Sequence, residues 1–95
     1  MLQSKRLEVA GVQVDVTPIE FRMFVLFARH LGQVLSHERI LAEVWGDRYD
    51  QATQYVWVHI SHVRKKLLAA GATGVAIETV RSVGYRMQAV QTSAQ

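Results

Sequence analysis

Residues 53–67, TQYVWVHISHVRKKL, decide the fold that this 95-residue chain is expected to adopt. Helical periodicity gives this segment two different faces. The face expected to meet a core carries Val56, Ile60, Val63 and Leu67. The opposite face carries Gln54, Val58, Ser61 and Lys65, with Tyr55 and His62 on one flank and Trp57, Arg64 and Leu68 on the other. The side chains of the outer surface are therefore small and polar toward the amino end of the helix and cationic toward its carboxyl end.

Such a surface suits the major groove of DNA, which admits a helix and presents donors, acceptors and the thymine methyl group. Gln54, Ser61 and His62 can form hydrogen bonds with base edges, and Val58 can contact a thymine methyl. The cationic groups of residues 64 and 65 can reach phosphates, which fix register rather than sequence. For Trp57 we instead expect burial, beneath the loop at residues 46–52.

The residues before this segment predict two short strands and two helices. Alternating apolar and polar positions in residues 5–16 indicate two strands and a turn. Thr17, Pro18 and Glu20 predict the start of a helix that runs to about His30. Its core stripe is expected to contain Ile19, Met23, Phe24, Leu26, Phe27 and Leu31. The polar side chains expected on its solvated face are Glu20, Arg22 and Arg29.

A second helix is predicted to start at Ser36 and to end at Gly46, and the third to span residues 53–69. Residues 76–90 then indicate a hairpin with Gly84 in its turn. Short amino-terminal antiparallel strands, three helices and a carboxyl-terminal hairpin form the order of an α+β winged helix-turn-helix. We expect one domain over residues 1–95, with residues 91–95 a frayed tail.

The uneven charge distribution fits either a polyanionic partner or a solvated basic face. Residues 53–95 hold five Lys and Arg side chains against Glu78 alone, whereas residues 1–52 are close to neutral. The chain has no cysteine, which excludes disulfides and a thiolate zinc site. Its longest apolar run, MFVLFA, is too short to span a bilayer, and no signal peptide is visible. The expected location is the cytoplasm, without contact with a membrane.

The residues predict neither an enzyme nor a cofactor. Histidines are the only evident bases, and the chain has no glycine-rich phosphate loop and no serine in a nucleophile elbow. His59 and His62 lie one helical turn apart, but no convincing further metal ligands accompany them. We therefore expect no metal site.

Three segments together resemble the carboxyl-terminal effector domain of OmpR/PhoB-type response regulators. They are VTPIEFRMFVLFARHLGQVLSHERILAEVW, VHISHVRKKL and IETVRSVGYR, which together cover roughly residues 14–88. The TPIEFR and QYVWVHISHVRKKL segments resemble the KdpE-like branch. The resemblance implies a bacterial two-component regulator whose winged helix binds double-stranded promoter DNA, usually as a dimer on direct repeats. It also implies a receiver domain and a sensor kinase in the full-length protein.

Carried over by position, the resemblance implies roles for individual residues. The base-reading candidates are Gln54, Tyr55, Val58, Ser61 and His62. The phosphate candidates are Trp45, His59, Arg64, Lys65 and Thr79. Arg81, at the tip of the wing, is the candidate for an adjacent minor groove, and a narrow A·T-rich groove would attract it. The loop with Asp47, Arg48, Tyr49 and Asp50 is the candidate for contact with RNA polymerase.

The chain departs from the family pattern at four places. Ser61 and His62 stand where arginines are frequent, Ser82 stands where glycine is usual, and Trp57 stands at a position that is often acidic. Residues 1–16 supply only two or three short strands, whereas the family domain usually begins with four. A second class of function stays open beside DNA binding, because Trp57, Val58 and Tyr55 also suit a winged-helix module that binds another protein.

Overall fold

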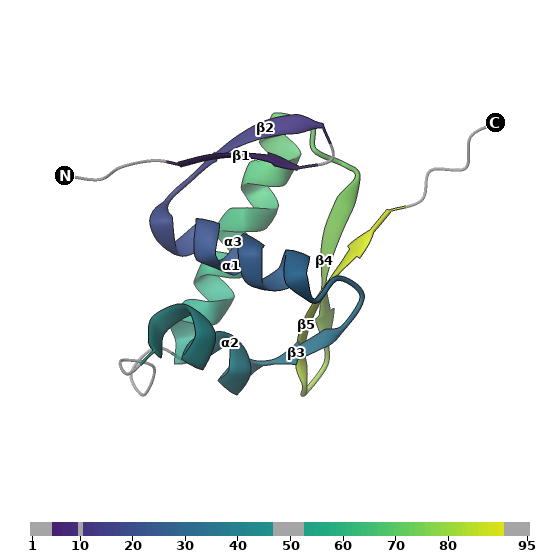
Figure 1. Ribbon diagram of the computed structural model, residues 1–95. Helices are drawn as coiled ribbons and strands as arrows, with labels where there is room; N and C mark the ends of the chain where they lie inside the picture. The colour runs from purple at the N-terminus through teal and green to yellow at the C-terminus, as the bar shows by residue number, and fades with distance from the viewer. Residues whose placement is uncertain (1–4, 10, 47–52, 91–95) are drawn as a thin grey trace.

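The computed structural model describes residues 5–9, 11–46 and 53–90, and for Lys5 and residues 53–55 it describes the backbone only. Three helices pack between a two-stranded and a three-stranded sheet (Figure 1). The order is β1 (Lys5–Val9), β2 (Val12–Val16), α1 (Pro18–Arg29), β3 (Val34–Ser36), α2 (His37–Trp45), α3 (Thr53–Ala70), β4 (Val75–Val80) and β5 (Gly84–Ala89). This is the expected α+β winged helix-turn-helix. None of the described helices is long and apolar enough to cross a membrane.

Local sequence explains where the helices begin and end. Thr17 Oγ1 accepts a hydrogen bond from the Glu20 amide, and a Glu20 carboxylate oxygen accepts one from the Thr17 amide, which completes the predicted capping box of α1. Ser36 caps α2 through the amide of Arg39. Gly46 follows α2 with a positive φ of 65°, a conformation that glycine adopts without a steric penalty.

Strand β3 is the element that the sequence did not reveal. Its three residues pair with β5, so that the order of the sheet is β3-β5-β4 and the chain segment before α2 joins the wing. Only Leu35 of the strand is buried, and a single buried residue has no periodicity to detect. The strand exists because the distant hairpin offers it a pairing edge.

The prediction that Gly84 lies in the turn of the wing is wrong. The turn consists of residues 81–83, and Gly84 is the first residue of β5, opposite both Ser36 and Val80. A Cβ atom at Gly84 would lie 1.9 Å from the backbone oxygen of Leu35. The residue with the positive φ in this turn is Ser82, at 67°. Gly84 is therefore required by the close approach of β3.

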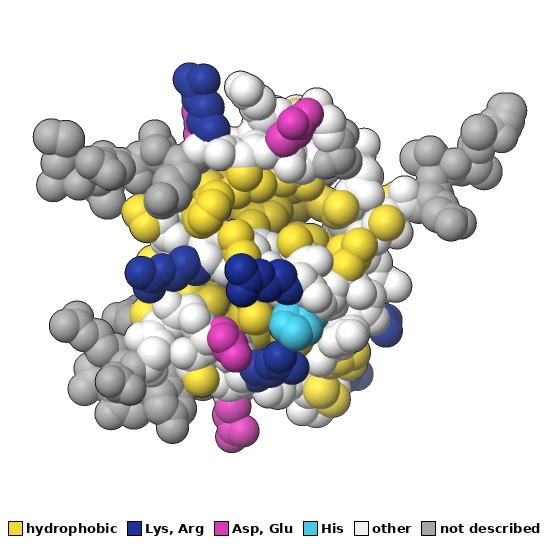
Figure 2. All heavy atoms as spheres, viewed as in Figure 1, with side chains coloured by type: hydrophobic (Ala, Val, Ile, Leu, Met, Phe, Trp, Pro, Cys, Tyr) yellow, Lys and Arg dark blue, Asp and Glu magenta, His cyan; other side chains and the backbone are white. Residues whose placement is uncertain are grey.

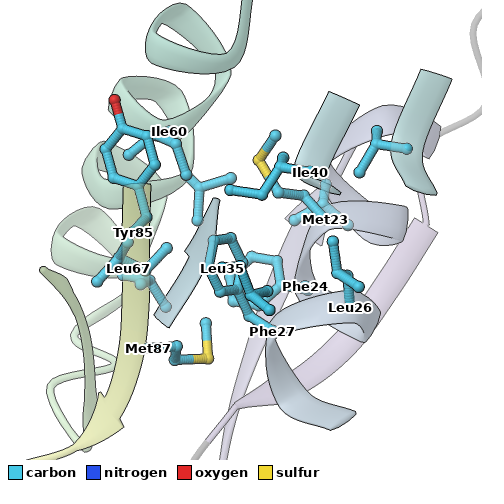
Figure 3. Packing of buried hydrophobic residues seen from close by; sticks show 14 of the residues in the cluster. Met23, Phe24, Leu26, Phe27, Leu35, Ile40, Ile60, Leu67, Tyr85 and Met87 are labelled. Carbon is cyan, nitrogen blue, oxygen red and sulfur yellow. The ribbon is translucent and has the colours of Figure 1, made fainter. Parts of the chain in front are cut away.

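The hydrophobic core joins all three helices to both sheets (Figure 3). Phe27 and Met23 of α1, Ile40 of α2 and Ile60 of α3 are fully buried, and Leu35 of β3 lies among them. Tyr85 and Met87 enter from β5 beside Leu67. The core thus fixes α3 against both α1 and the wing.

Two expectations for α1 fail for reasons of packing. Leu31 was expected in the core but exposes 48% of its surface, because α1 ends at Arg29 and the chain turns away through Gly32. Glu20 was expected on a solvated face but is buried, because α3 brings the Lys66 ammonium to its carboxylate at 2.5 Å. The ion pair links α1 to α3.

Candidate nucleic-acid interface

Helix α3 has the two faces that the sequence predicts. Val56, Ile60 and Val63 expose at most 1% of their surface, and Leu67 exposes 4%. On the other side, His62 and Lys65 are exposed, and Val58 and Ser61 are partly exposed. Residues 58, 61, 62 and 65 follow one another at helical spacing and therefore form one continuous face. We call these four residues the outer face of α3.

Three aromatic side chains form a row that ends on this face, at His62. The ring of Trp45, at the end of α2, lies 5.2 Å from that of His59 in an edge-to-face arrangement. The His59 ring in turn lies 6.0 Å from the ring of His62. Trp45 packs partly against the core, as expected, and so holds the carboxyl end of α2 against α3. The row brings two phosphate candidates next to one base-reading candidate.

Arg64 connects α3 to the wing. Its Nε and Nη2 atoms donate to the carbonyl oxygen of Ile77 at 3.1 and 2.8 Å, and Nη2 also donates to Thr79 Oγ1 at 2.9 Å. Its guanidinium carbon lies 5.9 Å from the centre of the Tyr85 ring. The structure thus brings the candidates Arg64 and Thr79 together and uses the arginine to brace β4. Nothing in the sequence indicated this bracing role, because it depends on a carbonyl in another element.

The tip of the wing presents Arg81, Ser82 and Val83, all of which are exposed. Val83 exposes 49% of its surface and was not among the sequence candidates. Its place in the predicted turn RSVG was the one indication that it lies at the tip. The wing therefore ends in a cation and an apolar side chain.

Glu78, the single acidic side chain among residues 53–95, is paired with a cation of its own sheet. Glu78 accepts hydrogen bonds from Arg86 Nη2 and Gln88 Nε2, each at 2.6 Å. The hydrogen bond from Arg86 holds the pKa of Glu78 below its ordinary value. Glu78 therefore does little to offset the positive charge of the outer face.

Several candidates cannot be placed. The side chains of Gln54 and Tyr55, and all of Asp47, Arg48, Tyr49 and Asp50, lie outside the part of the chain whose side chains the structure describes.

Trp57 was expected to be buried, but it exposes 63% of its surface, which corrects that expectation. Among the described residues, no group of three or more His, Asp or Glu side chains is arranged to hold a metal ion.

Sequence comparison identifies the class of protein. Residues 11–87 match the family described as "Transcriptional regulatory protein, C terminal". The chain belongs to this family, the winged-helix effector domains of OmpR/PhoB-type response regulators.

Two named regulatory proteins are similar to the chain in sequence, in agreement with this family assignment. The chain is 39% identical over 89 residues to the transcriptional regulatory protein PrrA of Mycobacterium tuberculosis, in a match that covers 92% of the chain and 38% of PrrA. It is 36% identical over 76 residues to the alkaline phosphatase synthesis transcriptional regulatory protein PhoP of Bacillus subtilis, in a match that covers 80% of the chain and 32% of PhoP. The chain thus spans about a third of the length of such relatives.

Solved structures show the same fold. The DNA-binding domain of CpxR from E. coli is 32% identical with a TM-score of 0.66, and the match covers 90% of this chain and 98% of that domain. The RstA DNA-binding domain of Klebsiella pneumoniae, solved in complex with the RstA box, is 32% identical with a TM-score of 0.69. That match covers 87% of this chain and 82% of the RstA chain.

Proposed function

We propose that this chain binds double-stranded promoter DNA in a sequence-specific manner and thereby regulates transcription. The observation that carries the proposal is the outer face of α3, whose polar, apolar and cationic side chains stay accessible while the opposite face is buried. The relationship to RstA, whose structure contains its DNA box, supports the same function. In this proposal α3 enters the major groove and the wing reaches the adjacent minor groove.

The outer face divides into two kinds of contact. Val58 would meet a thymine methyl group, and Ser61 and His62 would form hydrogen bonds with base edges. Gln54 and Tyr55, four and three residues before Val58 in the sequence, extend this set as predictions from sequence. Lys65 would pair with a phosphate, and this contact would strengthen binding to every sequence alike.

The remaining phosphate candidates border this face. The Trp45 indole and the His59 imidazole can donate to phosphates beside the row of rings. Thr79 Oγ1 accepts from Arg64, so the hydroxyl hydrogen of Thr79 remains for donation to a phosphate oxygen. Arg64 would act through its charge and by bracing the wing. Arg81 would enter the minor groove, with Val83 beside it at the tip.

Further partners follow from the family rather than from contacts in this chain. We infer that the full-length protein contains a receiver domain served by a sensor kinase, and that it acts in the bacterial cytoplasm, where promoter DNA lies. Dimeric binding to direct repeats and contact between the loop at residues 47–50 and RNA polymerase are part of the same proposal.

The test is selection of bound sequences from a random double-stranded DNA library at two salt concentrations. We expect an enriched motif and retention that falls steeply with salt, because neutralised phosphates release counterions. Val58→Ala should relax preference at one base step, whereas Lys65→Ala should weaken binding to all sequences alike. Absence of any retained DNA at low salt would reject the proposal. Equal, sequence-independent effects of both variants would reject base reading by α3.

A protein-binding role remains the second candidate because two large apolar side chains on one flank of α3 are exposed. Trp57 exposes 63% of its surface and Leu68 exposes 75%. They lie on the flank of α3 that also contains Arg64. Salt separates the two functions, since an apolar contact with a protein would not weaken as salt rises, whereas DNA binding would.

A further inference from the structure

Trp57 is a large exposed side chain of α3 that has no part yet in the proposed DNA binding. It exposes 63% of its surface, although tryptophan is highly buried on average in folded proteins. Helix α3 carries three basic residues and no acidic one. By contrast, the face of the molecule seen in Figure 2 carries Asp and Glu side chains beside its Lys and Arg side chains. A large apolar ring is thus exposed on an element whose charge suits a polyanion.

Trp57 lies on the flank of α3 that faces the wing. At about 100° per residue, Trp57 lies to one side of Val58 around the helix, and His59 lies equally far to the other side. The His59 ring contacts an aromatic ring of α2. Arg64 lies on the same flank as Trp57, about two turns later, and donates two hydrogen bonds to a carbonyl oxygen of β4. One flank of α3 therefore faces α2, and the flank with Trp57 faces the side of the wing.

The tip of the wing lies toward the amino end of α3, where Trp57 is. Leu68 and Val75 line the same surface pocket, and Arg64, one turn earlier in α3, bonds to Ile77, which comes later in β4. Strand β4 therefore runs in the opposite direction to α3. Figure 1 likewise shows that α3 begins, and the wing turns, at the lower end of the molecule. The first turns of α3 and the tip of the wing thus belong to one end of the fold.

This placement determines which part of a DNA duplex would meet Trp57. With α3 in the major groove and the wing in the adjacent minor groove, the sugar–phosphate strand that separates the two grooves must pass between them. An indole ring can pack against a deoxyribose, and its Nε1–H can donate to a phosphate oxygen. We infer, on the basis of the proposed DNA binding, that Trp57 makes both contacts with the strand that passes between α3 and the wing.

A contact of this kind differs in two measurable ways from the other contacts of α3. The indole is neutral, so it releases no counterion, and the salt dependence of binding does not depend on it, unlike the contact of Lys65. Sugar and phosphate carry no sequence information, so the contact strengthens binding to every site alike, unlike the contact of Val58. Trp57 should therefore raise affinity without changing either the salt dependence or the preferred sequence.

The decisive experiment measures the affinity of Trp57→Ala for the selected DNA site over a range of salt concentrations. We expect a loss of roughly tenfold at every salt concentration, with the wild-type salt slope and the wild-type motif. Leu68→Ala is the matched control, because Leu68 is an exposed apolar side chain on the same flank, about three turns from Trp57 and away from the wing tip. It should leave affinity unchanged. Both replaced side chains are exposed, so both variants should unfold at the wild-type temperature.

Fluorescence gives a direct readout of the contact. Trp45 and Trp57 are the two tryptophans of the chain, so Trp45→Phe leaves Trp57 as the one indole. Acrylamide, a neutral quencher, should quench Trp57 efficiently in the free chain, and saturating DNA should protect it.

The outcomes separate this inference from the proposed function. If wild type binds DNA but Trp57→Ala binds equally well, or DNA leaves the quenching of Trp57 unchanged, the inference is overturned and the proposed DNA binding stands. A lower salt slope, an effect confined to one base step, or an equal loss in Leu68→Ala would also overturn it. If wild type retains no DNA, the proposed function fails and this inference fails with it.

Discussion

At the scale of single residues, the ion pair between Glu20 and Lys66 shows how a charge is kept in a small core. The Glu20 side chain is 4% exposed and the Lys66 side chain 36% exposed. Burial raises the pKa of Glu20, but the hydrogen bonds from Lys66 and from the Thr17 backbone, together with the charge of Lys66, hold the pKa below its ordinary value of 4.5. The carboxylate is thus stable in the core only while Lys66 is present.

Replacement Lys66→Met should therefore destabilise the fold by roughly 1–3 kcal/mol near neutral pH, toward the lower end because Lys66 is partly solvated. A carboxylate with a lowered folded-state pKa stabilises the fold above its unfolded-state pKa and loses that contribution as pH falls through the lowered value. The difference in urea stability between wild type and variant should consequently shrink below about pH 4.5. Lys65→Met, next to it on the exposed face, should change stability by less than about 0.5 kcal/mol. An equal loss in both variants would contradict the assigned role of the buried pair.

The guanidinium of Arg64 provides the second residue-scale prediction. Arg64→Lys keeps the charge but loses the paired hydrogen bonds to the Ile77 carbonyl, so it should destabilise the chain by about 1–2 kcal/mol. Hydrogen exchange at the amides of β4 should accelerate more than exchange in β1 and β2. If Arg64 served only as a phosphate contact, Arg64→Lys would leave the stability and the exchange of the free protein unchanged.

At the scale of elements, the wing contains two positions, 82 and 84, at which a change to or from glycine should have opposite effects on stability. Gly84→Ala would place a Cβ atom 1.9 Å from the Leu35 oxygen, so β3 and β5 could not keep their pairing. We expect a loss of roughly 1–3 kcal/mol or more, measured by thermal unfolding. The effect is backbone against backbone, so no side-chain rearrangement relieves it.

Ser82→Gly should act in the opposite direction. Ser82 holds a φ of 67°, where a side chain is strained and glycine is not. After subtraction of the greater freedom of glycine in the unfolded chain, we expect a gain of up to about 1 kcal/mol in the same unfolding assay. A loss of stability would show that Ser82 makes a contact at the tip that outweighs its backbone strain.

At the scale of the whole molecule, the uneven charge of the two halves predicts how DNA binding depends on salt. Two of the basic side chains of residues 53–95 form ion pairs within the chain, Lys66 with Glu20 and Arg86 with Glu78. Lys65 and Arg81 stay exposed on α3 and on the wing. The tertiary structure therefore selects which of the cations can meet phosphates.

We expect affinity for a selected DNA site to fall by about a thousandfold between roughly 50 and 200 mM salt. Lys65→Ala should lower the slope of log affinity against log salt by about 1, because one phosphate contact is lost. Lys66→Ala should leave that slope close to its wild-type value despite the lower stability of the fold. Equal slopes for the Lys65 variant and wild type would remove Lys65 from the interface.

The sequence by itself determined the features that depend on residues close together in the chain. The capping residues and glycines set the helix ends, and the 3.6-residue repeat of α3 separated Val56, Ile60 and Val63 from Ser61 and Lys65. The order of elements then indicated the winged helix, and the motifs indicated the family. The base-reading and phosphate roles of individual residues stay predictions.

Only the tertiary structure decided the features that depend on segments far apart in the chain. Glu20 is buried because Lys66, 46 residues away, reaches it, and Arg64 braces the wing through a carbonyl 13 residues away. Strand β3 forms, and Gly84 is required, because the same backbones meet across the sheet. No pattern within α1, α3 or residues 34–36 contains these partners. Local preferences specify each element, but which polar groups are buried and which backbones pair depends on how the elements pack.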